Sequence, residues 1–219
     1  MKISDLTTLL HYYKSLGFSE IYVTPTFQPT LNDIKKTITD CQRCKLCSSR
    51  TNIVFGEGNE HSEIMFIGEG PGADEDKQGR PFVGKAGQLL TSLIQKLGLS
   101  REDVYIANIV KCRPPNNRDP EPDEISACYP YLKQQIAVIK PKVIMALGKV
   151  STHTLLNIEE PLNKFSIMKA RGNFSNYIDG LISIPVMPTY HPSYLLRNSE
   201  AKWDVWDDAQ KMMRRLKDG

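Results

Sequence analysis

Cysteines are the residues whose spacing most directly predicts chemistry in this chain. Cys41 and Cys44 form a C-x2-C pair, and Cys112 and Cys128 flank a proline-rich segment farther along. Such a pair with two distant cysteines is typical of a four-thiolate site, which suits either tetrahedral zinc or a [4Fe–4S] cluster. Cys47 is a fifth thiol that could replace one of these ligands or remain free. The spacing leaves the metal open, but it favours a structural site, since nothing indicates an open position for substrate.

A glycine-rich stretch, 68–87 (GEGPGADEDKQGRPFVGKAG), is the second candidate for chemistry. It follows the apolar run 64–67 and precedes a segment with helical periodicity. Ligands of open α/β sheets bind at the carboxyl ends of strands, and glycines let a backbone approach them closely. A P-loop is excluded because no Gly-Lys-Ser/Thr follows. A dinucleotide-binding fingerprint is excluded because a proline and a run of acidic residues follow the G-x-G. The acids at 74–76 repel one another, so we expect them to shape the rim of a pocket.

Four short runs rich in β-branched residues must position the cysteines and the glycine-rich stretch. They are predicted as strands at 64–67, 104–109, 143–147 and 184–187, with helices at about 31–39, 86–97, 122–139, 149–157 and 200–216. Strands that alternate with helices predict parallel βαβ units, and hence an α/β protein: a three-layer α/β/α sandwich with a central four-stranded parallel sheet. The loops at the carboxyl ends of these strands should converge on one edge of the sheet and form a single site.

The N-terminal residues differ from the rest. Residues 1–35 are predicted to be a helical arm and proline-containing linker, ahead of the main domain at 36–219. The arm either packs on the domain or binds a partner, and the sequence leaves both open. The formal charge of +3 permits a nucleic-acid partner without demanding one. No apolar run reaches the length of a membrane span and no signal peptide is evident, so we expect a cytoplasmic monomer with reduced thiols.

Four motifs taken together resemble the iron–sulfur, family 4 uracil-DNA glycosylases of bacteria and archaea. They are C-x2-C at 41–44, the glycine-rich stretch 68–87, NIVKCRPPNNR at 108–118 with Cys128, and HPSYLLRN at 191–198. The resemblance covers about residues 38–215 and implies an α/β/α fold. It also implies a monofunctional hydrolase that removes uracil from DNA in base excision repair, with no dissociable cofactor. By this resemblance Cys41, Cys44, Cys112 and Cys128 hold a structural [4Fe–4S] cluster, and the family does not require Cys47.

The resemblance implies roles for five residues around a flipped uracil. Phe82 stacks on the base, and Asn108 donates to O4 and accepts from N3–H, a pattern that rejects cytosine. Glu75 crowds the methyl group of thymine. The main-chain N–H of Gly70 holds O2, and His191 stabilises the uracil anion that leaves.

Further roles concern water and DNA. Glu69 is expected to orient the attacking water or to stabilise the oxocarbenium-like sugar. Family 1 glycosylases carry aspartate where this chain has Gly70, so leaving-group and electrostatic effects must carry more of the catalysis. Leu195 matches the intercalating position. The remaining expected DNA contacts are Arg113, Asn117, Arg118, Ser193 and Arg197.

Two alternatives stay open from sequence alone. The first is a metal-containing DNA-binding protein of this fold without glycosylase activity, against which the intact Glu69, Asn108 and His191 argue. The second is a glycosylase that prefers hypoxanthine or xanthine. A covalent uracil-binding subgroup carries an R-R-I-H insertion that this sequence lacks, so ordinary turnover is expected.

Overall fold

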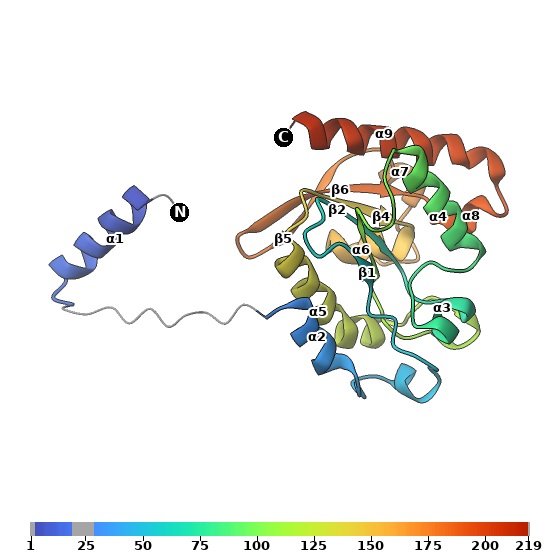
Figure 1. The fold of residues 1–219 in the computed structure, drawn as a ribbon, viewed down its shortest axis with the longest axis horizontal. Helices are drawn as coiled ribbons and strands as arrows, with labels where there is room; N and C mark the ends of the chain where they lie inside the picture. Colours follow the sequence, from blue (N-terminus) through green and yellow to red (C-terminus); the bar gives the residue numbers. More distant parts are fainter. Residues whose placement is uncertain (1–2, 19–28, 219) are drawn as a thin grey trace.

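The N-terminal arm and the start of the domain follow the expected pattern in part. The computed structural model describes residues 3–18 and 29–218 (Figure 1), so most of the predicted linker lies outside the described residues. Helix α1 covers Ile3–Ser15 and helix α2 covers Leu31–Ile38. A capping box begins α2: Thr30 and Asp33 each accept a backbone N–H from the other with their side chains.

A six-stranded sheet forms the centre of the domain, with the order β1-β3-β2-β4-β6-β5. The bounds are Glu57–Gly58 (β1), Ile64–Gly68 (β2), Tyr105–Asn108 (β3), Val143–Leu147 (β4), Ser175–Asp179 (β5) and Ile182–Thr189 (β6). The four predicted strands are confirmed as the parallel set β3-β2-β4-β6. Two antiparallel edge strands, β1 and β5, were not predicted. One has two residues and the other is mostly polar, so neither leaves an apolar run in the sequence.

Helices cover both faces of this sheet. Their bounds are Ala73–Gln78 (α3), Lys85–Lys96 (α4), Pro122–Ile139 (α5), Lys149–Leu155 (α6), Ile167–Ala170 (α7), Pro192–Leu195 (α8) and Lys202–Asp218 (α9), with short 3-10 turns at Lys45–Ser48, Pro115–Asn117 and Ser199–Ala201. Met65 and Ile67 of β2 face the core shared with α2 and α5. Ile64 and Phe66 face the core shared with α4 and α9. This alternation confirms the three-layer α/β/α architecture.

The expectation that the acids at 74–76 together shape the rim of a pocket is met only by Glu75, because Asp74 and Asp76 do not line the pocket. These acids lie in the first turn of α3, where the helix dipole stabilises negative charge, and not in an irregular loop. Asp76 is 3% exposed, and its Oδ1 accepts the N–H groups of Thr51 and Asn52 at 2.9 and 3.3 Å. It therefore ties α3 to the preceding chain, and of the three acids only Glu75 lines the pocket described below. No described helix combines the length and apolarity needed to cross a bilayer.

A buried ion pair fastens α9 to the residue that follows α7, and a hydrogen bond fastens it to the last strand. Asp208 has a fully buried side chain that accepts from Arg171 Nη2 at 2.7 Å and from Thr189 Oγ1 at 2.7 Å. Arg171 is itself only 17% exposed. Removing one partner of such a pair leaves the other charge uncompensated.

We therefore expect Asp208→Ala to lower the free energy of unfolding by about 3–5 kcal/mol, measured by urea denaturation. Asp207→Ala is the matched control, because Asp207 is exposed and pairs with Lys211 one helical turn away. Its change should stay within about 0.5 kcal/mol. Equal, small losses in both variants would contradict this account of the α9 anchor.

Candidate active site and cysteine site

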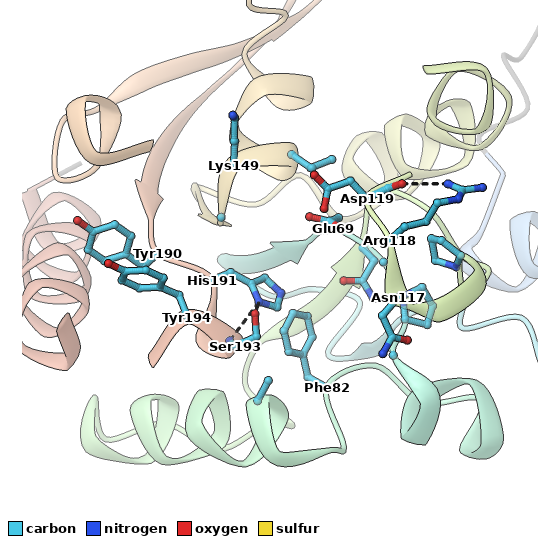
Figure 2. Close-up of a pocket in the computed structure, with 18 of the residues that line it drawn as sticks. Glu69, Phe82, Asn117, Arg118, Asp119, Lys149, Tyr190, His191, Ser193 and Tyr194 are labelled. Carbon is cyan, nitrogen blue, oxygen red and sulfur yellow. Dashed lines mark hydrogen bonds between the residues drawn. The ribbon is translucent and has the colours of Figure 1, made fainter. Parts of the chain in front are cut away.

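A pocket of about 640 Å³ lies at the carboxyl ends of the parallel strands. Its lining comes from the segments after β2, β3, β4 and β6, as Figure 2 shows for the labelled side chains. Parallel strands end on the same edge of a sheet, and this is why loops distant in sequence meet here. The predicted convergence of the four loops on one site is confirmed.

The floor of the pocket is built at Gly68, the last residue of β2. A Cβ at this position would lie 2.5 Å from Asn108 Oδ1 and 2.5 Å from Phe82 Cζ. The Asn108 amide and the Phe82 ring therefore flank the glycine, and no larger residue fits between them. Asn108 is 1% exposed, and among the described residues its Oδ1 is the one buried side-chain polar atom without a hydrogen-bond partner. A buried acceptor of this kind is costly unless a ligand donates to it.

Phe82 is held in a strained conformation. Its φ of 52° is unusual for a bulky residue, and such strain persists only where the surroundings enforce it. Glu75 Oε1 accepts the N–H groups of residues 83 and 84 at 2.9 Å each, and Arg101 Nη1 donates to the Phe82 carbonyl at 3.0 Å. A Cβ at Gly87 would lie 2.0 Å from the Phe82 carbonyl carbon, so α4 packs directly against this residue. Glu75 thus lines the pocket and also braces the Phe82 turn.

His191 caps the N-terminus of α8 and faces Phe82, with 5.8 Å between the ring centroids. Its Nδ1 accepts the N–H of Ser193 at 3.1 Å and lies 2.7 Å from the Ser193 hydroxyl. Because Nδ1 is an acceptor, the ring proton of the neutral imidazole belongs on Nε2. Burial lowers the pKa of His191 to about 4, so the ring is a neutral donor at physiological pH.

Glu69 follows Gly68 directly and lies in the same pocket. Burial, with a smaller contribution from the negative charge of Asp119, raises the pKa of Glu69 to about 7. The carboxyl group can therefore exist in both protonation states near neutral pH. Gly70 comes next, and a Cβ there would lie 2.7 Å from Val110 Cγ2, so the loop after β3 leaves no room for a side chain.

The loop after β3 reaches the pocket with polar groups that are partly engaged with one another. Arg113 Nε donates to Asn117 Oδ1 at 2.8 Å, and Asn117 lines the pocket with a φ of 55°. Arg118 also lines it, but its guanidinium donates to both oxygens of the buried Glu124 at 2.8 and 2.6 Å. Arg118 therefore shapes the loop in this conformation.

The segment after β6 presents the other predicted DNA contacts. Ser193 and Arg197 line the pocket, and Arg197 is exposed. Leu195 packs partly buried against the core next to α4 and α9, whereas its neighbour Leu196 is 50% exposed. Leu196 was not singled out from the sequence.

Several lining residues belong to the loops predicted to converge on the site but were given no individual role from the sequence. Asp119, Lys149, Tyr190 and Tyr194 all line the pocket (Figure 2). Tyr190 and Tyr194 pack together with 4.8 Å between their ring centroids. Each lies in a segment after a strand, which is the one signal that could have found them. Arg101 has no such signal, because it acts on Phe82 from a distant turn.

The predicted cysteine ligands gather at a second place. Cys41, Cys44, Cys112 and Cys128 line one small cavity between the start of the domain, the loop after β3 and α5, and Cys47 does not line it. Arg50 Nη1 lies 3.5 Å from Cys112 Sγ, and the N–H of Lys111 donates to Cys128 Sγ at 3.2 Å. Burial raises the pKa of Cys112 to about 11 and also raises that of Cys128. Within residues 3–18 and 29–218, no three His, Cys, Asp or Glu side chains are arranged to hold a single metal ion.

Comparison with known proteins gives independent evidence for the family to which the chain belongs. Residues 55–210 match the family model described as the uracil DNA glycosylase superfamily. The chain is 48% identical over 188 residues to a type-4 uracil-DNA glycosylase of Thermotoga maritima, covering 85% of this chain and 94% of the relative. It is 51% identical over 187 residues to one of Saccharolobus solfataricus (85% and 86% covered). A third, of Sulfurisphaera tokodaii, is 50% identical over 184 residues (84% and 83% covered).

Proposed function

The chain belongs to the uracil DNA glycosylase superfamily and, within it, to the type-4 uracil-DNA glycosylases, and we propose that its pocket hydrolyses the N-glycosidic bond of a uracil flipped out of DNA. The product is an abasic site, from which base excision repair proceeds. The observation that carries this proposal is the unpaired, buried Asn108 Oδ1 beside the Phe82 ring. A base must leave the duplex stack before it can reach such a site.

Recognition of uracil rests on Asn108 in this proposal. Its Oδ1 accepts from uracil N3–H and its amide N–H donates to O4, which repays the cost of the unpaired acceptor. Cytosine carries an unprotonated N3 and an amino group at these positions, so it would leave both groups of Asn108 unpaired. Phe82 stacks on the base, and Glu75 is placed towards C5, where a methyl group of thymine would be crowded.

His191 acts on the leaving group. Its Nε2–H is free to donate, since Ser193 occupies Nδ1, and we assign this donor to uracil O2. The negative charge of the departing base grows on O2 as the bond breaks, so a positioned neutral donor stabilises the transition state more than the ground state. The main-chain N–H of Gly70 is assigned to the same oxygen.

Glu69 acts on the other side of the bond. In its ionised form it orients the attacking water and stabilises the positive charge of the oxocarbenium-like sugar. The aspartate of family 1 enzymes has no counterpart here, because the Cβ of any residue at position 70 would collide with Val110. Catalysis therefore depends on the leaving group and on the ionisation of Glu69.

DNA is held by the loops that surround the buried base contacts. We assign phosphate contacts to Arg113, Asn117, Ser193 and Arg197, and a loop-shaping role with secondary phosphate contact to Arg118. The wedge that fills the gap left by the flipped nucleotide comes from the segment after His191. Leu195 forms its half-buried base and Leu196 its exposed tip.

We also propose that the glycosylase domain begins at α2, slightly earlier than the predicted boundary at residue 36, because Leu31 and Ile34 are buried in the core, and that the residues before α2 are an accessory arm. The family match at 55–210 supports a catalytic unit that does not include the arm.

For the cysteine site we propose a structural [4Fe–4S] cluster held by Cys41, Cys44, Cys112 and Cys128. The four thiols line one small cavity that Cys47 does not reach, as the ligands of one shared group must. Four cysteine thiolates are the usual ligand set of a [4Fe–4S] cluster. A bound cluster would fasten the loop after β3 to α5 and to the start of the domain.

The first prediction concerns activity and the two residues that contact the base. The protein should cut uracil-containing single- and double-stranded oligonucleotides at uracil after alkali treatment. Asn108→Ala and His191→Ala should lower kcat by roughly a hundredfold or more while DNA affinity changes by less than about threefold, because both act on the base and not on phosphates.

Exposed residues of the same types provide matched controls. Asn176→Ala on β5 and His61→Ala should behave as the wild type. Absence of strand breaks at uracil with the wild-type protein would refute the proposed function. Equal losses of turnover and DNA affinity would refute the roles of Asn108 and His191.

The second prediction concerns pH. Ionised Glu69 is the active form and its pKa is about 7, so kcat/KM should fall about tenfold per pH unit below 7 and level off above it. His191 stays neutral over this range. Asp119→Asn should shift the acidic limb of the pH profile of kcat/KM to lower pH, because the substitution removes a negative charge that raises the pKa of Glu69. Glu69→Gln should be slow at every pH, and a steep limb surviving in it would exclude Glu69 as the titrating group.

The third prediction concerns the metal. The purified protein should be brown, with broad visible absorbance and about four iron atoms per chain. Cys112→Ser should lose iron and melt at lower temperature, whereas Cys47→Ser should keep both iron and melting temperature, since Cys47 does not line the cavity. A colourless protein, prepared without oxygen and containing stoichiometric zinc, would contradict the cluster.

A further inference from the structure

Lys111 is a buried cation that the proposed mechanism does not use. It is 0% exposed, and an unpaired charge at such depth is strongly unfavourable. Its ammonium donates to the main-chain carbonyl of Asn108 at 2.9 Å and to Gln135 Oε1 at 2.6 Å. No carboxylate of the described residues pairs with it. The lysine is therefore kept in the core by two neutral acceptors.

Gln135 is itself oriented by the core. Its Nε2 donates to the carbonyl of Phe55 at 3.0 Å and to the hydroxyl of Tyr105 at 3.1 Å, which turns Oε1 towards Lys111. Both acceptors of the ammonium are thus fixed. A network in which every member is satisfied defines a single arrangement of its groups.

Lys111 lies between the pocket and the cysteine site. Its side chain reaches back to Asn108, which reads the base in the proposed function, while its backbone N–H donates to Cys128 Sγ and its neighbour in sequence is Cys112. Asn108 is also where the parallel pairing of β3 with β2 ends, opposite Gly68. The carbonyl of Asn108 accepts its hydrogen bond from the Lys111 ammonium.

We propose that Lys111 is a positioning residue for uracil recognition: by holding the Asn108 carbonyl, it sets the direction in which the Asn108 amide enters the pocket. The inference rests on the proposed function of Asn108. The peptide after Asn108 is held on both sides, because its carbonyl accepts from Lys111 and its N–H, that of Ile109, donates to the Gly68 carbonyl at 2.9 Å. Loss of the Lys111 donor would loosen this end of β3, and the gap beside Gly68 and Phe82 leaves the Asn108 amide no room to shift. Specificity for the base then depends on a lysine that never contacts it.

Direct binding of free uracil, measured by calorimetry, tests this without relying on turnover. Lys111→Met keeps the apolar stem and removes the donors. It should weaken uracil binding roughly ten- to hundredfold, lower kcat on uracil-DNA, and leave affinity for undamaged DNA and iron content at wild-type values. Gln135→Leu is the matched control, since it removes the other acceptor and leaves the bond to Asn108. It should lower thermal stability but keep uracil binding within about threefold.

Should Lys111→Met fail to fold, Lys111→Gln carries the same test, because its amide is too short to reach the Asn108 carbonyl from the same backbone position. Wild-type uracil binding in either folded Lys111 variant would overturn the proposal. Equal weakening in the Lys111 variant and in Gln135→Leu would also overturn it, by showing a general loss of core order. A wild-type protein that releases no uracil from DNA would instead refute the proposed function itself.

Discussion

The absence of a side chain at Gly68 is the constraint on which the active site depends. The Asn108 amide and the Phe82 ring both approach to 2.5 Å from the place a Cβ would occupy, so any other residue would push one of them away. In the proposed function, this closeness lets one base contact the Phe82 ring with its face and the Asn108 amide with its edge. The strained Phe82 turn follows from the same demand, and Glu75, Arg101 and Gly87 hold it in place.

Burial also determines the charge state of the pocket. It lowers the pKa of His191 and raises that of Glu69, so both groups move towards their neutral forms. A pocket with this character suits a neutral nucleobase and is poor at holding phosphate. Arg118, Lys149 and Arg197 also line the pocket, from the loops after β3, β4 and β6, and Arg197 is exposed. In the proposed function, contacts to the DNA backbone therefore belong to the exposed rim, and contacts to the base belong to the buried groups.

Much of this could be predicted from sequence, because the informative signals are local. Apolar runs identify the four parallel strands, and glycines with adjacent polar residues at their ends identify the loops that line the pocket. Long-range effects could not be predicted in this way. Arg101 and Lys111 act through hydrogen bonds to backbone carbonyls, which no residue pattern reports. The acids at 74–76 were misread because a six-residue helix between two glycines leaves no periodicity to detect.

The relation between the cysteines and the pocket follows from chain continuity. Five consecutive residues, 108–112, run from the base-reading amide to a proposed cluster ligand, and within them the side chain of Lys111 turns back to its own strand end. The residues that follow Asn108 stay bonded to neighbouring chain. The N–H groups of Ile109 and Val110 donate to the carbonyls of Gly68 and Glu69 at 2.9 and 3.0 Å, and the Lys111 carbonyl accepts an N–H from the segment before β1. Attachment of Cys112 and Cys128 to the proposed cluster would add a further restraint at the far end of this segment. The proposed cluster would then restrain the segment that carries Asn108, while the residues to which we assign the chemistry of the glycosidic bond lie in the other pocket.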